Sequence, residues 1–242
     1  MTRLFLDNDL EGLKSFDLNE EDSRYISQVL RMKQGETLIC VDKSGMENVC
    51  TVSSFSKKSV TVTVGERRAN DSEAPIRVTL FQSVSKGERM DLTIQKATEL
   101  GVHSIVPVLS ERCVVRLDKD SKSKIERWQK IALEASRQSG RGKVPHIEMP
   151  VSFDEAVARI KDYDMTIFPW EEETNKGLKQ ALHEFNGNDI AVFIGPEGGY
   201  EVHEAEEAEK SGALRVTLGK RILRTETAGA AVLAMIVYEK EI

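Results

Sequence analysis

The first seventy residues alternate short apolar runs with polar turns, which predicts a small β-rich module. Three of these runs are rich in β-branched residues, the type favoured in strands: Leu38–Val41, Val49–Val52 and Val60–Val64. One helix is expected between them, because Asn19 can cap its amino end, residues 25–30 give it an apolar face, and Gly35 can stop it. We therefore predict a compact barrel with one helix.

The polar segment Glu66–Pro75 has no apolar periodicity and ends in proline, which is typical of an exposed linker. We place the domain boundary near Asn70, which gives one domain over residues 1–70 and a second over residues 71–242.

Beyond this boundary the chain alternates between strand and helix patterns. The expected strands are Ile76–Val84, Ser104–Val108, Met165–Phe168, Ile190–Ile194 and Leu214–Leu218. The clearest expected helices are Glu88–Leu100, Lys122–Ser139 and Thr225–Glu239. This alternation predicts an α/β domain with a mostly parallel sheet, helices on both faces, and ligands at the carboxyl ends of the strands.

Charge is unevenly distributed along a chain whose net charge is −6. Residues 86–143 hold 13 Lys and Arg against 8 Asp and Glu, whereas residues 144–218 hold 6 against 16. The basic segment is either an RNA-facing surface or a set of ordinary solvated helix faces, and composition leaves both open. The sequence has no apolar run of membrane-spanning length and no secretion signal, so we expect a cytoplasmic protein without membrane association. Scattered cysteines and histidines predict no metal site.

Two strand ends carry the candidate chemistry. After the expected strand at Ile190–Ile194, the residues Gly195–Gly199 form a glycine-rich loop that lets the backbone approach a ligand closely. The loop is either a ligand site or a tight turn, and it matches neither the dinucleotide nor the nucleoside-triphosphate motif. The second strand end is the segment Leu218–Ala231, where a short basic loop enters a helix of small residues with Thr225 as its expected N-cap. Its backbone groups suit an adenine and a ribose, and Arg221 or Arg224 suits an RNA phosphate; an ordinary helix cap beside two surface arginines is the alternative.

Taken together, Gly195–Gly199 and Leu218–Ala228 closely resemble the cofactor-binding region of SPOUT methyltransferases. The resemblance continues through further segments: Arg3–Phe5, Val29–Met32, Ser85–Met90, Gln95–Val102, Pro107, Ser110–Cys113 and Ser139–Arg141. Essentially the whole chain thus resembles the ribosomal RNA small subunit methyltransferase E family, which methylates N3 of a uridine in small-subunit ribosomal RNA.

This resemblance implies a PUA-like RNA-binding domain followed by an α/β domain with a deep trefoil knot, and a homodimer. It implies S-adenosylmethionine as cofactor, no metal, and ribosomal RNA, most simply the assembled small subunit, as substrate. The sequence departs from the family pattern at Tyr25, where histidine is common, and at Trp170, which we expect to be pocket wall or surface packing.

Site residues follow from the same resemblance. The expected cofactor-binding residues are Phe168, Gly195, Glu197, Gly198, Leu218, Gly219, Ile222, Leu223, Arg224, Thr225, Thr227 and Ala228. The expected RNA contacts are Arg3, Arg31, Lys86, Arg89, Lys96, Arg112, Arg137 and Arg141. Because N3 of uracil must lose a proton, the catalytic candidates are Glu197 as base and Arg3 or Arg224 as anion-stabilising cations. For Glu197, capping the next helix is the alternative role.

Two other functional classes remain open. A non-catalytic RNA-binding or ribosome-assembly factor would keep the fold and lose the cofactor motifs, which are intact here. A phosphate-binding α/β enzyme would need a phosphate-cradling lysine in the glycine-rich loop, and the loop has none.

Overall fold

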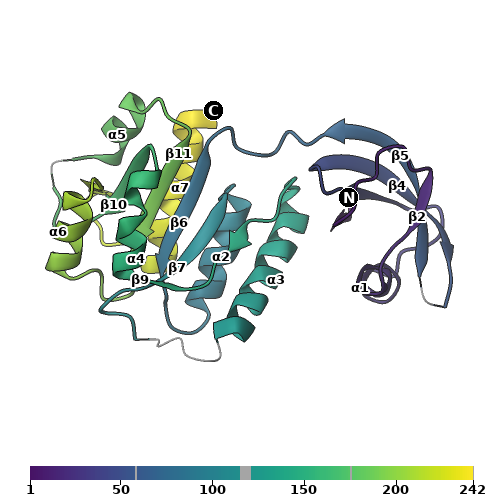
Figure 1. Cartoon of the computed structure of the whole chain (residues 1–242), viewed down its shortest axis with the longest axis horizontal. Coiled ribbons are helices and arrows are strands. Elements are labelled where there is room, and N and C mark those ends of the chain that lie inside the picture. Colours follow the sequence, from purple (N-terminus) through teal and green to yellow (C-terminus); the bar gives the residue numbers. More distant parts are fainter. Residues whose placement is uncertain (58, 115–120, 175, 242) are drawn as a thin grey trace. The chain divides into compact units, whose positions relative to one another are not determined.

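The computed structural model describes residues 1–57, 59–114, 121–174 and 176–241, and the chain forms two compact units (Figure 1). The first unit comprises Met1–Glu73 together with Ser136–Val144, and the second comprises Ala74–Ala135 and Pro145–Ile242. The chain therefore returns to the first unit after the expected boundary near Asn70. The prediction divided the sequence only once, so it did not assign residues 136–144 to the first unit.

The first unit is built on a five-stranded sheet with the order β1-β3-β4-β5-β2. Its strands are β1 (Arg3–Phe5), β2 (Ser15–Asp17), β3 (Thr37–Val41), β4 (Met46–Phe55) and β5 (Val60–Ala69). Strands β1 and β3 are parallel, and the other pairs are antiparallel. The expected linker is wrong over residues 66–69, because these polar residues extend β5 and pair with β4. Residues 66–69 form a strand because they pair with β4, although their polar composition is typical of a linker.

The helix of the first unit is shorter than expected. Asn19 does cap it, because its Oδ1 accepts a hydrogen bond from the Asp22 amide at 2.7 Å. Helix α1 (Glu20–Arg24) continues as a π-helical turn, η1 (Tyr25–Val29), and the helix ends before Gly35. Arg31 adopts a left-handed backbone with φ of 53°, so it closes the helix in the place where glycine is usual.

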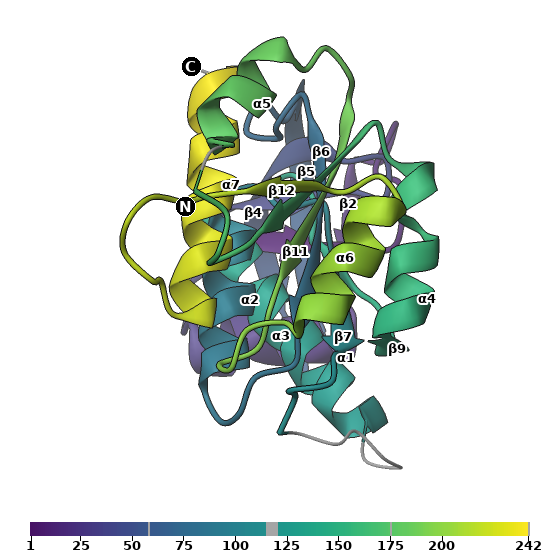
Figure 2. The same cartoon turned by 90° about the vertical axis from the view of Figure 1, so that its left-hand side faces the viewer.

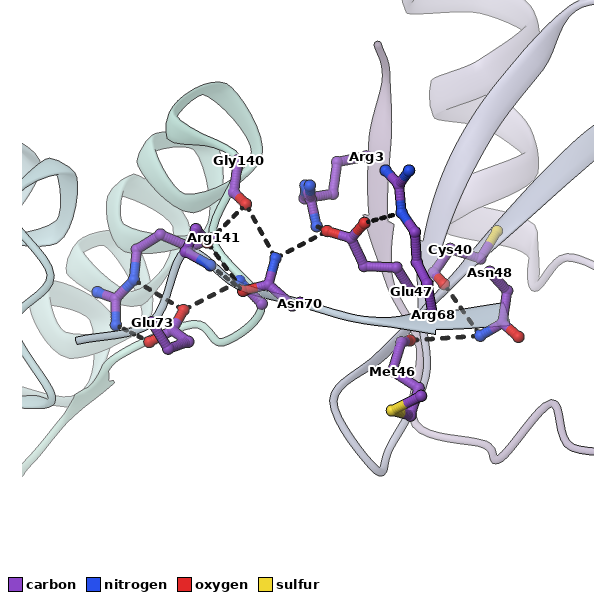
Figure 3. Close-up of polar contacts among 12 residues, drawn as sticks. Arg3, Cys40, Met46, Glu47, Asn48, Arg68, Asn70, Glu73, Gly140 and Arg141 are labelled. Carbon is purple, nitrogen blue, oxygen red and sulfur yellow. Dashed lines mark hydrogen bonds and ion pairs between the residues drawn. The ribbon is translucent and has the colours of Figure 1, made fainter. Parts of the chain in front are cut away.

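A partly buried polar network fastens Ser136–Val144 to the rest of the first unit (Figure 3). The Glu73 carboxylate accepts hydrogen bonds from the Arg141 guanidinium at 2.7 Å and from two backbone amides of residues 142 and 143 at 2.9 and 3.0 Å. Asn70 donates to Glu47 at 2.7 Å and to the Gly140 carbonyl at 3.3 Å. Burial alone would raise the pKa of the Glu73 carboxyl, but the hydrogen bonds and charge of Arg141 outweigh it and lower that pKa, so the ionised form is favoured.

The second unit contains a parallel sheet with the strand order β12-β10-β11-β6-β7-β8, and β9 pairs separately with β7. Its strands are β6 (Arg77–Ser83), β7 (Ser104–Leu109), β8 (His146–Ile147), β9 (Val151–Ser152), β10 (Met165–Pro169), β11 (Asp189–Ile194) and β12 (Leu214–Val216). The helical segments are α2 (Arg89–Glu99), α3 (Ser121–Ser139), α4 (Phe153–Ala158), η2 (Ile160–Asp162), α5 (Leu178–Glu184), α6 (Val202–Lys210) and α7 (Thr225–Glu241). The predicted α/β domain with a mostly parallel sheet is confirmed.

Helices cover both faces of this sheet, with α2 and α7 on one side and α4 and α6 on the other (Figure 2). The face below α4 and α6 is packed with aromatic rings. Phe81 and Phe193 stack with centroids 4.5 Å apart, and Phe168 lies 4.6 Å from the ring of Tyr200. This core fixes the carboxyl ends of β6, β10 and β11 relative to one another. Among the described residues, no helix is long and apolar enough to cross a membrane.

The network around Glu73 gives a stability prediction. We expect Glu73→Gln to lower the free energy of unfolding by about 3 kcal/mol, because Arg141 is buried and would lose its charged partner. Urea denaturation measures this change. Glu20→Gln is the matched control, since Glu20 forms an exposed helical ion pair with Arg24 and its loss should cost less than about 0.5 kcal/mol. Equal effects of the two substitutions would contradict the assignment.

Candidate functional site

A cavity of about 810 Å³ opens where β10, β11 and β12 end. Nine of the twelve residues expected to bind a cofactor lie in its wall: Gly195, Glu197, Leu218, Gly219, Ile222, Leu223, Arg224, Thr225 and Ala228. Phe168 lies instead in the aromatic core, fully buried. Gly198 and Thr227 are outside the wall as well, although both neighbour residues that form it. The two loops singled out from the sequence thus surround one cavity.

Thr225 joins these two loops. Its hydroxyl donates a hydrogen bond to the Gly195 carbonyl at 2.7 Å and accepts one from the Gln82 side chain at 2.9 Å. The expectation that Thr225 caps α7 is wrong, because Thr225 is the first residue of the helix and its hydroxyl bonds to the loop after β11. Residues from β6, the glycine-rich loop and α7 are therefore held together by one buried side chain.

The glycine-rich loop needs glycine at two positions. A Cβ on Gly195 would lie 3.2 Å from the Tyr200 ring and 3.3 Å from the Gly199 backbone, tighter than most Cβ contacts. Gly199 has φ of +71°, a conformation that side chains disfavour. Gly198 lies in ordinary contact with Arg112, with a Cβ position 3.4 Å from its Cδ. Glycine is therefore required at the two ends of the loop, Gly195 and Gly199.

Glu197 is fixed by the loop that follows β6. Its Oε1 accepts hydrogen bonds from the Lys86 amide at 2.9 Å and from the Arg89 guanidinium at 2.7 Å. Burial would raise the pKa of this carboxyl, but the hydrogen bonds and the positive charge of Arg89 outweigh it and lower that pKa. Glu197 does not cap the next helix, because Glu201 is the N-cap of α6. Its carboxylate is thus already held by protein donors.

Arg112 holds the same loop from the other side. Its guanidinium donates to the Gly198 carbonyl at 2.7 Å and forms a two-pronged pair with Glu201 at 2.6 and 2.8 Å. The loops after β6 and β7 therefore clamp the loop after β11 between Arg89 and Arg112. Two arginines expected to contact RNA are engaged in positioning the cavity wall.

The remaining expected RNA contacts divide into paired and unpaired side chains. In the first unit, Arg3 pairs with Glu47 at 2.6 Å, Arg141 with Glu73, and Arg137 with Asp22 while its guanidinium lies 4.4 Å from the Tyr25 ring centre. Lys96 pairs with Glu99 along α2. Arg31 and Lys86 are exposed and have no ion pair within the described part of the chain.

Sequence reasoning missed part of the cavity wall. Tyr200, Glu171 and Glu226 were not expected there but line the cavity, whereas Trp170, only 7% exposed, lines it in one of its two expected roles. Trp170 and Glu171 follow β10 directly, so the rule that ligands bind at carboxyl strand ends was a usable signal for them. Glu226 had no local signal beyond its place beside Thr225. Among the described residues, no group of three or more His, Cys, Asp or Glu side chains is placed to hold a metal ion.

The link made by Thr225 gives a second prediction. We expect Thr225→Val to lower the free energy of unfolding by about 2 kcal/mol, because the partly buried Gly195 carbonyl and the buried Gln82 amide would lose hydrogen bonds. Thr227→Val, two residues along and exposed, is the control and should change stability by less than about 0.5 kcal/mol. Chemical denaturation of both variants measures the difference, and indistinguishable midpoints would rule out the role given to Thr225.

Comparisons with known proteins agree with this geometry. An RNA methyltransferase domain family matches residues 72–237, and an RNA methyltransferase PUA domain family matches residues 18–65. The chain is 36% identical to ribosomal RNA small subunit methyltransferase E of Bacillus subtilis over 251 aligned positions, covering 100% of this chain and 98% of the relative.

Solved structures show the same likeness. The crystal structure of ribosomal RNA small subunit methyltransferase E from Neisseria gonorrhoeae, bound to S-adenosyl methionine, matches with a TM-score of 0.90 and 34% identity over 98% of this chain and 97% of that one. A Legionella pneumophila protein solved with the bound cofactor SAM matches with a TM-score of 0.89 and 32% identity, over 98% and 97% of the two chains. This chain, with its two motif loops joined around one cavity, belongs to the ribosomal RNA small subunit methyltransferase E family.

Proposed function

We propose that this protein uses S-adenosylmethionine to methylate N3 of one uridine in small-subunit ribosomal RNA, and that its substrate is the assembled small subunit. The observation that carries the proposal is the cavity at the strand ends, whose wall combines the glycine-rich loop with the loop Leu218–Arg224. Relatives that cover almost the whole chain carry the corresponding name, and one of them was crystallised with the cofactor.

The cavity fits S-adenosylmethionine in size and chemistry. Its volume of about 810 Å³ lies within the range of small-molecule sites. Trp170, Leu218 and Leu223 give apolar walls for an adenine, and the exposed backbone of the Leu218–Arg224 loop gives donors and acceptors for its edge. Carboxylates in the wall favour a ligand with a sulfonium and an ammonium group. The residues present therefore suit the cofactor.

The protein's part in the reaction is mainly positioning. The bound cofactor supplies an electrophilic methyl carbon next to a positively charged sulfur. The clamped glycine-rich loop and the Leu218–Arg224 loop bind and orient the cofactor, and Trp170 and Tyr200 exclude water from one side of the cavity. Lys220, Arg221 and Arg224 line the cavity and have no ion pair within the described residues, which supports a role for them in holding RNA phosphate and stabilising a uracil anion.

We further propose a homodimer in which the outer face of α7 is covered by a second copy. Residues 228–237 of α7 are all apolar or glycine, a composition typical of a buried helix. Yet Met235 is 42% exposed and Tyr238 is 70% exposed in the single chain. We also propose a trefoil knot in the second unit, because the family resemblance implies it. We propose a cytoplasmic location, because ribosomal subunits mature in the cytosol.

The proposed activity is tested by incubating the protein with labelled S-adenosylmethionine and either assembled small subunits or free ribosomal RNA. Nucleoside mass spectrometry should then detect N3-methyluridine, with a faster reaction on the assembled subunit. A different methylated nucleoside would overturn the base assignment, and a faster reaction on free RNA would overturn the choice of particle.

The clamp around the glycine-rich loop gives a separate prediction. We expect Arg112→Lys to weaken S-adenosylmethionine binding about 10-fold by calorimetry, because lysine cannot reproduce the two-pronged pair with Glu201 and the bond to Gly198. The salt dependence of RNA binding should be unchanged, since Arg112 is engaged within the protein. Arg127→Lys is the control, because that arginine pairs with Asp91 away from the cavity. Weaker RNA binding with unchanged cofactor binding would show that Arg112 contacts RNA.

A further inference from the structure

The cavity wall contains four glutamates, and three of them contact protein donors or solvent. Glu197 accepts hydrogen bonds from Lys86 and Arg89. Glu173 accepts one from the Lys176 amide at 3.2 Å. Glu171 is exposed to solvent, with its carboxylate against the backbone of Gly199. Water or protein donors therefore already serve these three carboxylates.

Glu226 differs from them. It lies in the first turn of α7, directly after Thr225, and its residue lines the cavity. Its Oε2 atom is buried, and no hydrogen-bond partner for it exists among the described residues. Burying a carboxylate oxygen without a donor is costly, so a group left unsatisfied in this way is a candidate for a functional role.

We propose that Glu226 is the general base of the reaction, accepting the N3 proton of the target uracil. This inference rests on the proposed function. The Glu226 carboxylate takes the proton, the N3 electron pair forms the new bond to the methyl carbon, and the carbon–sulfur bond breaks with its electrons passing to sulfur. The sulfonium becomes a neutral thioether and the carboxylate becomes a carboxylic acid, so charge and atoms balance.

The surroundings of Glu226 support this assignment over Glu197. Both hydrogen bonds reach Oε1 of Glu197 and, with the charge of Arg89, lower the pKa of this carboxyl despite its burial, so it is a weaker base. Glu226 lines the same cavity, and no hydrogen bond or ion pair engages its carboxylate within the described part of the chain. The cations at 220, 221 and 224 follow each other along the loop that leads into α7, so negative charge developing on uracil would be stabilised close to where its proton leaves.

The test compares Glu226→Gln with the wild-type protein in single-turnover methylation of small subunits, with cofactor affinity measured by calorimetry. We expect the methylation rate to fall about 100-fold or more, the contribution typical of a general base, while the Kd for S-adenosylmethionine stays within about 2-fold. Glu206→Gln, on the exposed surface of α6, is the matched control and should react at the wild-type rate.

A second variant separates a base from a structural role. Glu226→Ala should be slow in sodium chloride and partly restored by sodium formate at equal ionic strength, because formate can occupy the space of the missing carboxylate and accept the proton. Glu226→Gln at the wild-type rate, or Glu226→Ala without any response to formate, would overturn the assignment. Loss of cofactor binding in Glu226→Gln would make Glu226 a cofactor ligand instead. A wild-type product other than N3-methyluridine would overturn the proposed function separately, whatever the variants do.

Discussion

The buried hydrogen bonds of Thr225 hold the cavity together, because they join segments that lie far apart in the sequence. One hydroxyl connects the Gly195 carbonyl, at the end of β11, with Gln82 on β6, and does so from the first turn of α7. The glycine-rich loop, the Leu218–Arg224 loop and the Glu226 carboxylate all take their places from this junction. Since Gln82 is fully buried and Gly195 is partly buried, an alternative placement of α7 would leave polar groups unsatisfied, which is why the junction is specific.

Arginines surround this junction and stabilise its loops. Arg89 and Arg112 grip the glycine-rich loop from opposite sides through Glu197, Glu201 and the Gly198 carbonyl. In the first unit, Arg141 stabilises a loop in the same way, through its ion pair with Glu73. A basic segment in a sequence can therefore serve loop geometry as well as nucleic acid. The cations without protein partners, such as those at the cavity rim, are the better guide to an RNA-facing surface.

The cavity combines fixed and uncommitted charges. Glu197 has its donors within the protein and contributes rigidity, whereas Glu226 keeps a buried oxygen without one. Lys220, Arg221 and Arg224, on the neighbouring loop, have no ion pair within the part of the chain that the structure describes. Such a separation between charges that build the wall and charges left for a ligand is expected of a site that positions two reactants and moves one proton.

The sequence by itself determined the two-part organisation, the parallel α/β sheet and the two loops of the site, because strand and helix periodicity and glycine-rich strand ends are local signals. It also identified Asn19 as a cap, since capping involves residues three positions apart. Only the tertiary structure decided the rest. Residues 66–69 became strand through pairing with β4, and residues 136–144 joined the first unit through Glu73 and Asn70. Thr225 and Arg112 have roles that depend on hydrogen-bond partners about 30 to 145 residues away in the sequence. Glu226 has its role because an oxygen of its carboxylate has no partner among the described residues. No local sequence pattern encodes such relations.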